Sequence, residues 1–209
     1  MLTLSCPSCG ANVNFQSKSS VFAVCSFCKS SLVRQDMNLD EIGKIADLQD
    51  DLTPFQIGTT GMYNKEKFEI IGRLKVGYKD GFWNEWFTAF GDERVAWLAE
   101  AQGFLAFCYP YEATDLPEVK TLKIGQAVDL KEKGIYEIDD IRVVKCLFSE
   151  GELPFDAVQG RKSTSVDLTG FEQEMATIEY AAKETRTFIG HYLDFDDFQF
   201  KNLRPIDGW

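Results

Sequence analysis

Two C-x2-C cysteine pairs constrain the fold of this chain more than any other feature. Cys6 and Cys9 form the first pair, and Cys25 and Cys28 form the second after fifteen intervening residues. Each C-x2-C turn places two thiolates on one side of a tight loop, and two such loops supply the four sulfur ligands that a tetrahedral Zn²⁺ ion takes. Iron and a redox-active disulfide are the alternative uses of this spacing. The sequence therefore predicts a zinc ribbon over residues 1–35.

The zinc predicted here is structural rather than catalytic. Four protein ligands complete the coordination shell, so a catalytic water has no position on the metal. About 30 residues are too few to fold alone around an apolar core, so metal binding supplies the folding free energy. The residues between the pairs fit two short strands, one with Val13 and Phe15 and one around Ala23. Gly10 and Lys29 each follow the second cysteine of a pair, where the backbone has to turn.

The net charge of the chain limits which classes of partner it is expected to bind. The 209 residues carry a formal net charge of −11, which argues against a surface that binds nucleic acid or an anionic membrane. Residues 1–35 hold Lys18, Lys29 and Arg34 and no Asp or Glu, but a zinc–thiolate centre would cancel most of that positive charge. We therefore do not expect nucleic acid as the main partner.

Cysteine usage and the first residues indicate a cytoplasmic protein. The segment Met1–Cys6 has no basic region and no long apolar run, so we expect no signal peptide. No apolar stretch approaches the roughly 20 residues that span a bilayer. Six cysteines in such a chain suit metal ligands more than disulfides, and we expect Cys108 and Cys146, which lie in apolar segments, to be core residues.

The clearest strand pattern covers Lys67–Tyr78, where apolar residues alternate with charged ones. Asp80-Gly81 is a hairpin signal because glycine tolerates the positive φ that tight turns need, and a second, aromatic strand is predicted over Phe82–Phe90. Further strands are predicted at Phe55–Met62, Val95–Ala99, Phe104–Cys108, Ile141–Phe148, Thr164–Leu168, Met175–Tyr180 and Thr187–Leu193.

Three segments leave more than one structure open. Residues 36–54 are acidic and carry apolar residues at helical spacing, so a short amphipathic helix or an extended linker would fit. Arg94–Gln102 contains strong helix formers, but its length between two turns favours a strand. The sequence of Phe195–Phe200 is ambiguous and does not decide its structure.

Many short strands with regular turns are typical of a sandwich or barrel. The proline-containing run Tyr109–Lys120 separates two segments that echo one another, because the chain from Ile57 and the chain from Ile124 both pass from Ile-Gly through a charged turn to an aromatic-Glu-Ile strand. We therefore predict a mainly β chain with two similar barrel- or sandwich-like halves. Its parts are a zinc ribbon (1–35), a linker (36–54), a first β subdomain (55–112) and a second β subdomain (118–209).

Several short sequence motifs of this chain are similar to those of a known family. L-T-P-F-Q-I-G-T-T-G, F-E-I-I-G-R-L, F-W-N-E-W and W-L-A-E-A-Q-G follow one another from Leu52 to Gly103, and S-E-G-E-L-P-F, V-D-L, A-T-I-E-Y and D-G-W follow later. With these strings the chain resembles zinc-ribbon-bearing members of the bacterial family called domain of unknown function 4178. The resemblance implies a zinc ribbon followed by a β-rich body, and it implies neither an activity nor catalytic residues.

The most prominent polar–aromatic cluster is Trp83-Asn84-Glu85-Trp86. If the Asp-Gly pair forms the loop, Val76 faces Glu85, and Glu85 lies on the apolar face with Trp83. A bulge at Gly81 would instead turn Trp86 inward and Glu85 outward. The cluster is either a pair of core tryptophans beside a structural carboxylate or an aromatic groove for a peptide or ligand. A buried Glu85 needs a partner, and the candidates are Arg73 and Arg94.

Other acidic residues and the single histidine are weaker candidates. Glu150 and Glu152 stand two apart with glycine between them, a spacing that suits acid–base work, cation binding or a plain surface turn. Asp167 and Glu179 would have to join them in space. His191 lies on a predicted strand, where a hydrogen-bonded structural role is the commoner one, and no nucleophile-elbow or dinucleotide motif accompanies it.

These features favour a non-enzymatic scaffold or adaptor that carries structural Zn²⁺ and binds a protein partner through its β body. No catalytic residue is assigned. The candidate partner or ligand surface consists of Trp83, Glu85, Trp86, Glu150 and Glu152. One alternative is a hydrolase-like enzyme that uses Glu150, Glu152, Asp167 or His191, and another is nucleic-acid binding by the ribbon.

Overall fold

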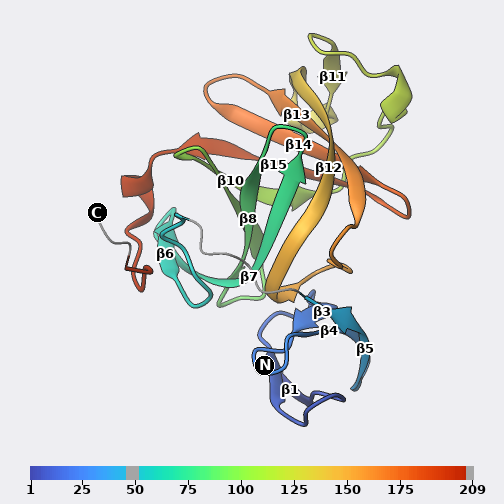
Figure 1. Cartoon of the computed structure of the whole chain (residues 1–209). Helices are drawn as coiled ribbons and strands as arrows, with labels where there is room; N and C mark the ends of the chain where they lie inside the picture. Colours follow the sequence, from blue (N-terminus) through green and yellow to red (C-terminus); the bar gives the residue numbers. More distant parts are fainter. Residues whose placement is uncertain (46–51, 206–209) are drawn as a thin grey trace.

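Short segments rich in apolar and aromatic residues form strands over much of the computed structural model, which describes residues 1–45 and 52–205 (Figure 1). The predicted mainly β class is confirmed. The N-terminal module, residues 1–45, contains β1 (Leu2–Ser5), β2 (Asn12–Phe15), β3 (Phe22–Val24), β4 (Ser30–Gln35) and β5 (Asn38–Lys44).

The described part of the body, residues 52–205, contains ten strands and three short 3-10 helices. The strands are β6 (Thr60–Tyr63), β7 (Glu66–Tyr78), β8 (Gly81–Phe90), β9 (Val95–Ala101), β10 (Phe104–Tyr111), β11 (Ala127–Asp129), β12 (Ile135–Leu153), β13 (Lys162–Thr169), β14 (Glu174–Ala181) and β15 (Thr185–Leu193). The 3-10 helices are η1 (Val119–Thr121), η2 (Lys131–Lys133) and η3 (Phe195–Phe198).

Eight antiparallel strands close into a barrel in the order β7-β8-β9-β10-β15-β14-β13-β12, and β12 pairs with β7 to complete it (Figure 1). The segments 55–112 and 118–209 each supply four of these strands, so the two halves enclose one interior. The closing seam is tight, because a Cβ on Gly72 would lie 1.8 Å from the Glu152 carbonyl oxygen.

Both faces of the barrel wall carry apolar clusters. Trp86 and Phe87 are neighbours in β8, yet they belong to different clusters because successive strand residues point to opposite faces. Phe87 lies in the interior cluster with Leu74, Val76 and Trp97. Trp86 lies in an outer cluster, which Phe55 and Phe198 of η3 also join. A second outer cluster lies on the other half, where Val128 and Leu130 of the long β10–β12 connection pack with Ile138, Val166 and Ile178.

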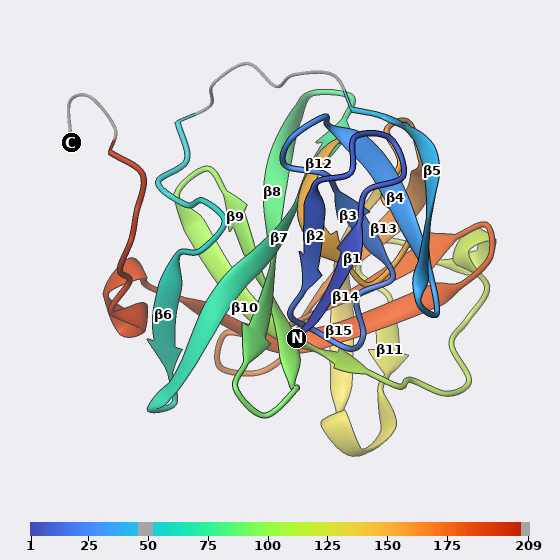
Figure 2. The same ribbon diagram turned by 90° about the horizontal axis from the view of Figure 1, so that it is seen from below.

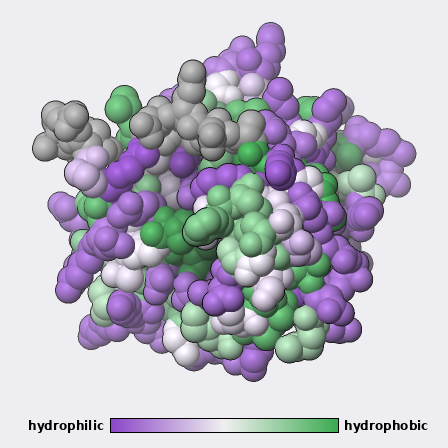
Figure 3. Space-filling view, turned by 60° about the horizontal axis from the view of Figure 1, so that its bottom comes forward, coloured by the Kyte–Doolittle hydropathy of each residue, from purple (hydrophilic) through white to green (hydrophobic). Residues whose placement is uncertain are grey.

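The N-terminal module is joined to the barrel by sheet pairing. The last residues of β12 pair with β3, Glu152 with Ala23 and Leu153 with Phe22, so one sheet runs from the module into the barrel wall (Figure 2). Phe22 is fully buried in the interior cluster of the barrel. Figure 3 brings this lower part of the molecule forward and shows apolar residues gathered near the middle of the face, with hydrophilic residues around them.

The structure corrects the expectation for the connector. Asn38–Lys44 is a strand that pairs with β4, so a helix is wrong for these residues, while residues 46–51 lie outside the described part. The helical spacing of Leu39, Ile42 and Ile45 misled the prediction. Pairing with β4 determines the conformation of this segment and overrides its local pattern. As a result the three residues do not form one buried face, and Ile42 is 44% exposed.

The remaining ambiguous segments resolve clearly. Val95–Ala101 is β9, whose two faces are buried in different clusters, so tertiary packing overrides helix propensity there. Phe195–Phe198 is η3. The strand predicted over Phe55–Met62 is confined to Thr60–Tyr63. Within the described residues, no helix is both long enough and apolar enough to cross a membrane.

Candidate metal centre and barrel cavity

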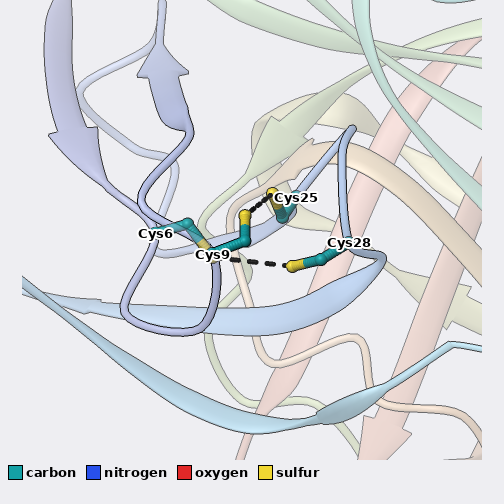
Figure 4. A group of neighbouring side chains, drawn as sticks. All are labelled: Cys6, Cys9, Cys25 and Cys28. Atoms are coloured by element: carbon teal, nitrogen blue, oxygen red, sulfur yellow. Dashed lines mark hydrogen bonds between the residues drawn. The ribbon is translucent and has the colours of Figure 1, made fainter.

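The four cysteines of the N-terminal module converge on one point (Figure 4). Their sulfur atoms all lie within 4.8 Å of one another, and the Cys6–Cys28 and Cys9–Cys25 sulfur pairs are 3.7 and 3.8 Å apart. A tetrahedron of sulfurs about 2.3 Å from a central ion has edges of about 3.8 Å. The donor set and its spacing therefore fit a metal ion held by four thiolates.

The two cysteine turns have the same local geometry. Gly10 and Lys29, which follow the second cysteine of each turn, both have positive φ angles of 75° and 59°. The Gly10 N–H donates to the Cys6 carbonyl at 2.9 Å, and the Lys29 N–H donates to the Cys25 carbonyl at 3.0 Å. This shared backbone turn brings the two thiols of each pair to one side, as the C-x2-C spacing predicts.

Polar side chains from the first cysteine turn, β4 and β5 support the cysteine cluster. Ser30 Oγ lies 3.2 Å from Cys28 Sγ and donates to Glu41 Oε1 at 3.1 Å, and Ser8 Oγ donates to the other oxygen of Glu41. These hydrogen bonds lower the pKa of Glu41. Glu41 lies in the segment that sequence reasoning treated as a connector, so it was missed as part of this site.

A second candidate site is the barrel cavity. Its mouth encloses about 690 Å³ at the end of the barrel that carries the β7–β8 and β9–β10 turns. Aromatic and polar side chains line this mouth: Tyr78, Phe82, Trp83, Phe104, Tyr192, Arg142, Gln102, Gln173, Asp194 and Asp197.

A narrower space of about 170 Å³ continues from the mouth into the barrel. Trp83, Arg142 and Tyr192 line both spaces, so the two are continuous. Glu85 and Asp167 line the inner space. The barrel therefore carries ionisable groups deep inside a wall that is otherwise largely apolar.

Glu85 is a carboxyl group of this cavity whose pKa is strongly raised. Burial raises the pKa of Glu85 to about 7, and the Glu179 carboxylate adds to the rise. Trp83 Nε1 donates to Glu85 Oε1 at 2.8 Å, which acts in the opposite direction. Near neutral pH, Glu85 can therefore take up or release a proton.

Asp167 and Glu179 differ in their partners. Burial raises the pKa of Asp167, although Thr177 and Ser165 hydroxyls lie 3.0 and 3.2 Å from its Oδ1. Burial also opposes the ionisation of Glu179, but its ion pairs with Arg161 at 2.8 Å and Arg186 at 2.6 Å outweigh this effect and lower its pKa. Glu179 is thus a paired structural charge.

The opposite end of the barrel is filled by the β12–β13 connection. Phe155 and Ala157 are buried in the interior cluster together with Phe22 of the N-terminal module. The Arg186 guanidinium lies 3.5 Å from the centre of the Phe155 ring, and Trp97 stacks on the same ring at 6.0 Å. The cavity is therefore open at one end of the barrel and closed at the other.

The structure separates the residues of the hairpin cluster. Trp83 and Glu85 face the cavity, whereas Trp86 is fully buried in the outer cluster beneath the Arg73 guanidinium at 4.7 Å. Neither predicted partner pairs with Glu85. Arg73 donates to Asn84 instead, and Arg94 pairs with Asp92 and Glu66, because both arginines lie away from the interior face.

The other predicted site residues do not join the cavity. Glu152 is buried at the junction with the N-terminal module, where its carboxylate accepts the N–H groups of Gln16 at 2.7 Å and Ser17 at 3.3 Å. Glu150 lies opposite Arg73 on the β12–β7 seam. His191 is exposed on β15. Of the residues named for a hydrolase, only Asp167 lines the inner cavity.

Sequence reasoning missed the polar lining from the second half of the barrel. Ser163, Ser165 and Asp167 alternate with Thr164, Val166 and Leu168 in β13, so a strand with a polar face was visible. Nothing in the local sequence shows that this polar face points into a barrel, because a polar strand face is usually the solvent side.

Residues 56–195 match the model of a protein family described as domain of unknown function (DUF4178). No curated protein and no solved structure matches the chain. The matched segment contains β6 to β15 and leaves out the N-terminal module.

Proposed function

The chain belongs to the DUF4178 family, and we propose that it is a zinc-containing binding protein whose barrel takes up a small molecule through its mouth. This proposal depends on the cavity, which runs from a wide aromatic mouth to the carboxyl groups of Glu85 and Asp167. Ligand sites are typically concave and largely apolar, with a few convergent polar groups, and eight-stranded barrels can hold one small ligand.

Zinc is the proposed occupant of the cysteine cluster. Four thiolates with tetrahedral spacing suit Zn²⁺, and four protein ligands assign it a structural role. All six cysteines of the chain are free, which supports a reducing compartment and hence the cytoplasm as the proposed location.

The binding proposal is tested with the neutral fluorophore N-phenyl-1-naphthylamine, whose emission rises in apolar surroundings. Titration of the purified chain should give saturable fluorescence. Ala101→Trp should reduce the signal, because Ala101 is an exposed residue that lines both the mouth and the inner space. Ala127→Trp is the matched control, since Ala127 is exposed on β11 outside the barrel. Equal fluorescence from both variants, or no saturable signal at all, would reject the proposal.

A protein partner remains the second candidate, favoured by exposed aromatic side chains around the mouth. Phe82, Phe104 and Phe171 are 48%, 72% and 77% exposed, and each lies in or beside a turn at this end of the barrel. Replacing all three with serine should abolish capture of a specific partner and leave unfolding unchanged, because these rings bury little surface. Capture that survives the triple substitution would remove this candidate.

A further inference from the structure

The side chains that line the cavity carry an excess of negative charge. Glu85 and Asp167 lie in the inner space, and Asp194 and Asp197 line the mouth, where they also cap η3 through mutual backbone contacts. Among the described residues that line the two spaces, Arg142 is the basic one. An ion pair with Asp140 engages its charge, and its guanidinium lies 4.5 Å from the centre of the Tyr78 ring.

Aromatic rings surround the path to these carboxyl groups. Tyr78, Phe82, Trp83, Phe104 and Tyr192 line the mouth, and the Tyr78 and Trp83 rings lie 5.7 Å apart. The negative face of an aromatic ring attracts a cation, most strongly for tryptophan and tyrosine. A chamber with aromatic walls and carboxyl groups at its inner end suits a positively charged organic molecule.

The inner end of the cavity also contains a polar group that lacks a partner. Trp97 is 4% exposed and lines the deepest part of the interior beside Glu85, and among the described residues its indole N–H donates to no acceptor. Buried indole N–H groups usually find an acceptor. Within the described part of the chain Glu85 accepts one side-chain hydrogen bond, from Trp83, although a carboxylate can accept about four. Both groups therefore have hydrogen-bonding capacity to offer an occupant.

We propose that the barrel cavity selects a small organic ammonium ion over an anion of the same shape, with the ammonium group at Glu85 and Asp167. This inference rests on the proposed function of the barrel. Burial disfavours the charged form of both carboxyl groups in the empty chamber, and a bound cation reverses that preference. The aromatic walls hold the apolar part of the same molecule.

The test compares 2-phenylethylamine with 3-phenylpropanoate, two molecules of similar shape and opposite charge. Isothermal titration of the full chain at pH 8 should show the amine binding about tenfold or more tightly than the acid, because the two carboxylates attract one and repel the other. Glu85→Gln and Asp167→Asn should each reduce this ratio. Glu137→Gln should leave it unchanged, because Glu137 is an exposed carboxylate of β12 that does not line the cavity.

Affinity for the amine should rise between pH 6 and pH 8, since the pKa of Glu85 is about 7 and ionised Glu85 holds the cation better. The charged and titratable groups that face Glu85 are Asp167 of β13, Glu179 of β14, Arg186 of β15, Cys108 of β10, and Arg142 and Cys146 of β12. The rise should be absent in Glu85→Gln, which separates the effect of Glu85 from those neighbours.

The outcomes distinguish this inference from the function on which it rests. Equal affinity for amine and acid, or tighter binding of the acid, would overturn cation selection, while saturable binding of the neutral fluorophore would still support a ligand-binding barrel. If neither the fluorophore nor the amine binds, both proposals fail. A preference for the amine that survives both carboxyl substitutions would also overturn the inference.

Discussion

Two carboxyl groups inside one barrel differ in pKa because their partners differ. Glu179 is held between Arg161 and Arg186, and its pKa is lowered. Glu85 lies in the same interior without an ion pair, and its pKa is raised to about 7. Burial acts on both groups, so the difference shows that only a nearby opposite charge outweighs the loss of solvent.

The raised pKa of Glu85 predicts a pH-dependent stability. A carboxyl group with a pKa of about 7 in the folded state and 4.5 in the unfolded state favours folding below pH 4.5, and this contribution is lost as pH rises through 7. The loss amounts to at most about 3 kcal/mol. Glu85→Gln should therefore be more stable than the natural chain at pH 8 and lose less stability between pH 5 and pH 8. Urea unfolding across this range measures the difference, and parallel curves would contradict it.

Removing the charge of Glu179 should lower the stability of the chain, whereas removing that of Glu85 should raise it at pH 8. Glu179→Gln leaves Arg161 and Arg186 with the half-exposed Glu184 as their remaining shared anion, at 3.6 and 3.3 Å, so the loss of the closer, largely buried carboxylate should cost about 2 kcal/mol at neutral pH. The same urea unfolding assay at pH 7 provides the measurement, with Glu137→Gln as an exposed control. A change as small as that of the control would show that solvent already satisfies the two arginines.

At the scale of elements, closure of the barrel depends on the β7–β12 seam. β12 has an irregularity between Cys146 and Phe148 in its pairing with β7, and β7 has one between Ile70 and Gly72 in its pairing with β8. Such bulges bend and twist a strand, which a small closed barrel requires. Gly72 lets the two backbones approach at this point.

Gly72→Ala should therefore weaken the barrel. The added Cβ would lie 1.8 Å from the Glu152 carbonyl oxygen, so the seam has to open, at an expected cost of about 2 kcal/mol or more. Gly91→Ala is the control, because nothing lies within 4 Å of its Cβ and its φ is not positive. Chemical denaturation monitored by tryptophan fluorescence compares the two, and equal midpoints would contradict the role given to Gly72.

At the scale of the whole molecule, the N-terminal module and the barrel form one structure. β3 extends the sheet of β12, Phe22 fills part of the barrel interior, and Glu152 accepts two backbone N–H groups of the module. Unfolding of the N-terminal module should therefore destabilise the barrel, because it would expose Phe22 and leave the buried Glu152 carboxylate without its two N–H donors.

Metal removal should consequently lower the stability of the barrel. Cys9→Ser is the informative variant, since Cys9 is the exposed member of the cluster and its replacement removes a ligand with little loss of packing. We expect elemental analysis to find about one zinc per natural chain and less in the variant. Trp83, Trp86 and Trp97 report on the barrel, and their thermal transition should fall in the variant and after chelation. An unchanged barrel transition after zinc loss would show that the two parts are independent.

Hydrophobic periodicity and cysteine spacing were enough to predict the local structures of this protein, which depend on residues close together in the chain. The C-x2-C turns and most strands follow from local pattern. Glu85 faces the cavity, as one of the two registers left open for the hairpin predicts. The hairpin loop is Lys79-Asp80, one residue earlier than predicted, and Leu74 rather than Val76 faces Glu85. That shift moves each pairing by two residues, which keeps every side chain on the same face.

Tertiary structure alone decided how these parts combine. Pairing between Gly72 and Gly151 joins residues far apart in the chain, and no local pattern encodes that contact. The same closure turned the polar face of β13 into a cavity lining, converted part of the connector into β5, and buried Trp86 outside the barrel while Trp83 lines the inside. A sequence fixes which residues share a strand face, but only the closed sheet determines whether that face meets solvent, a core or a chamber.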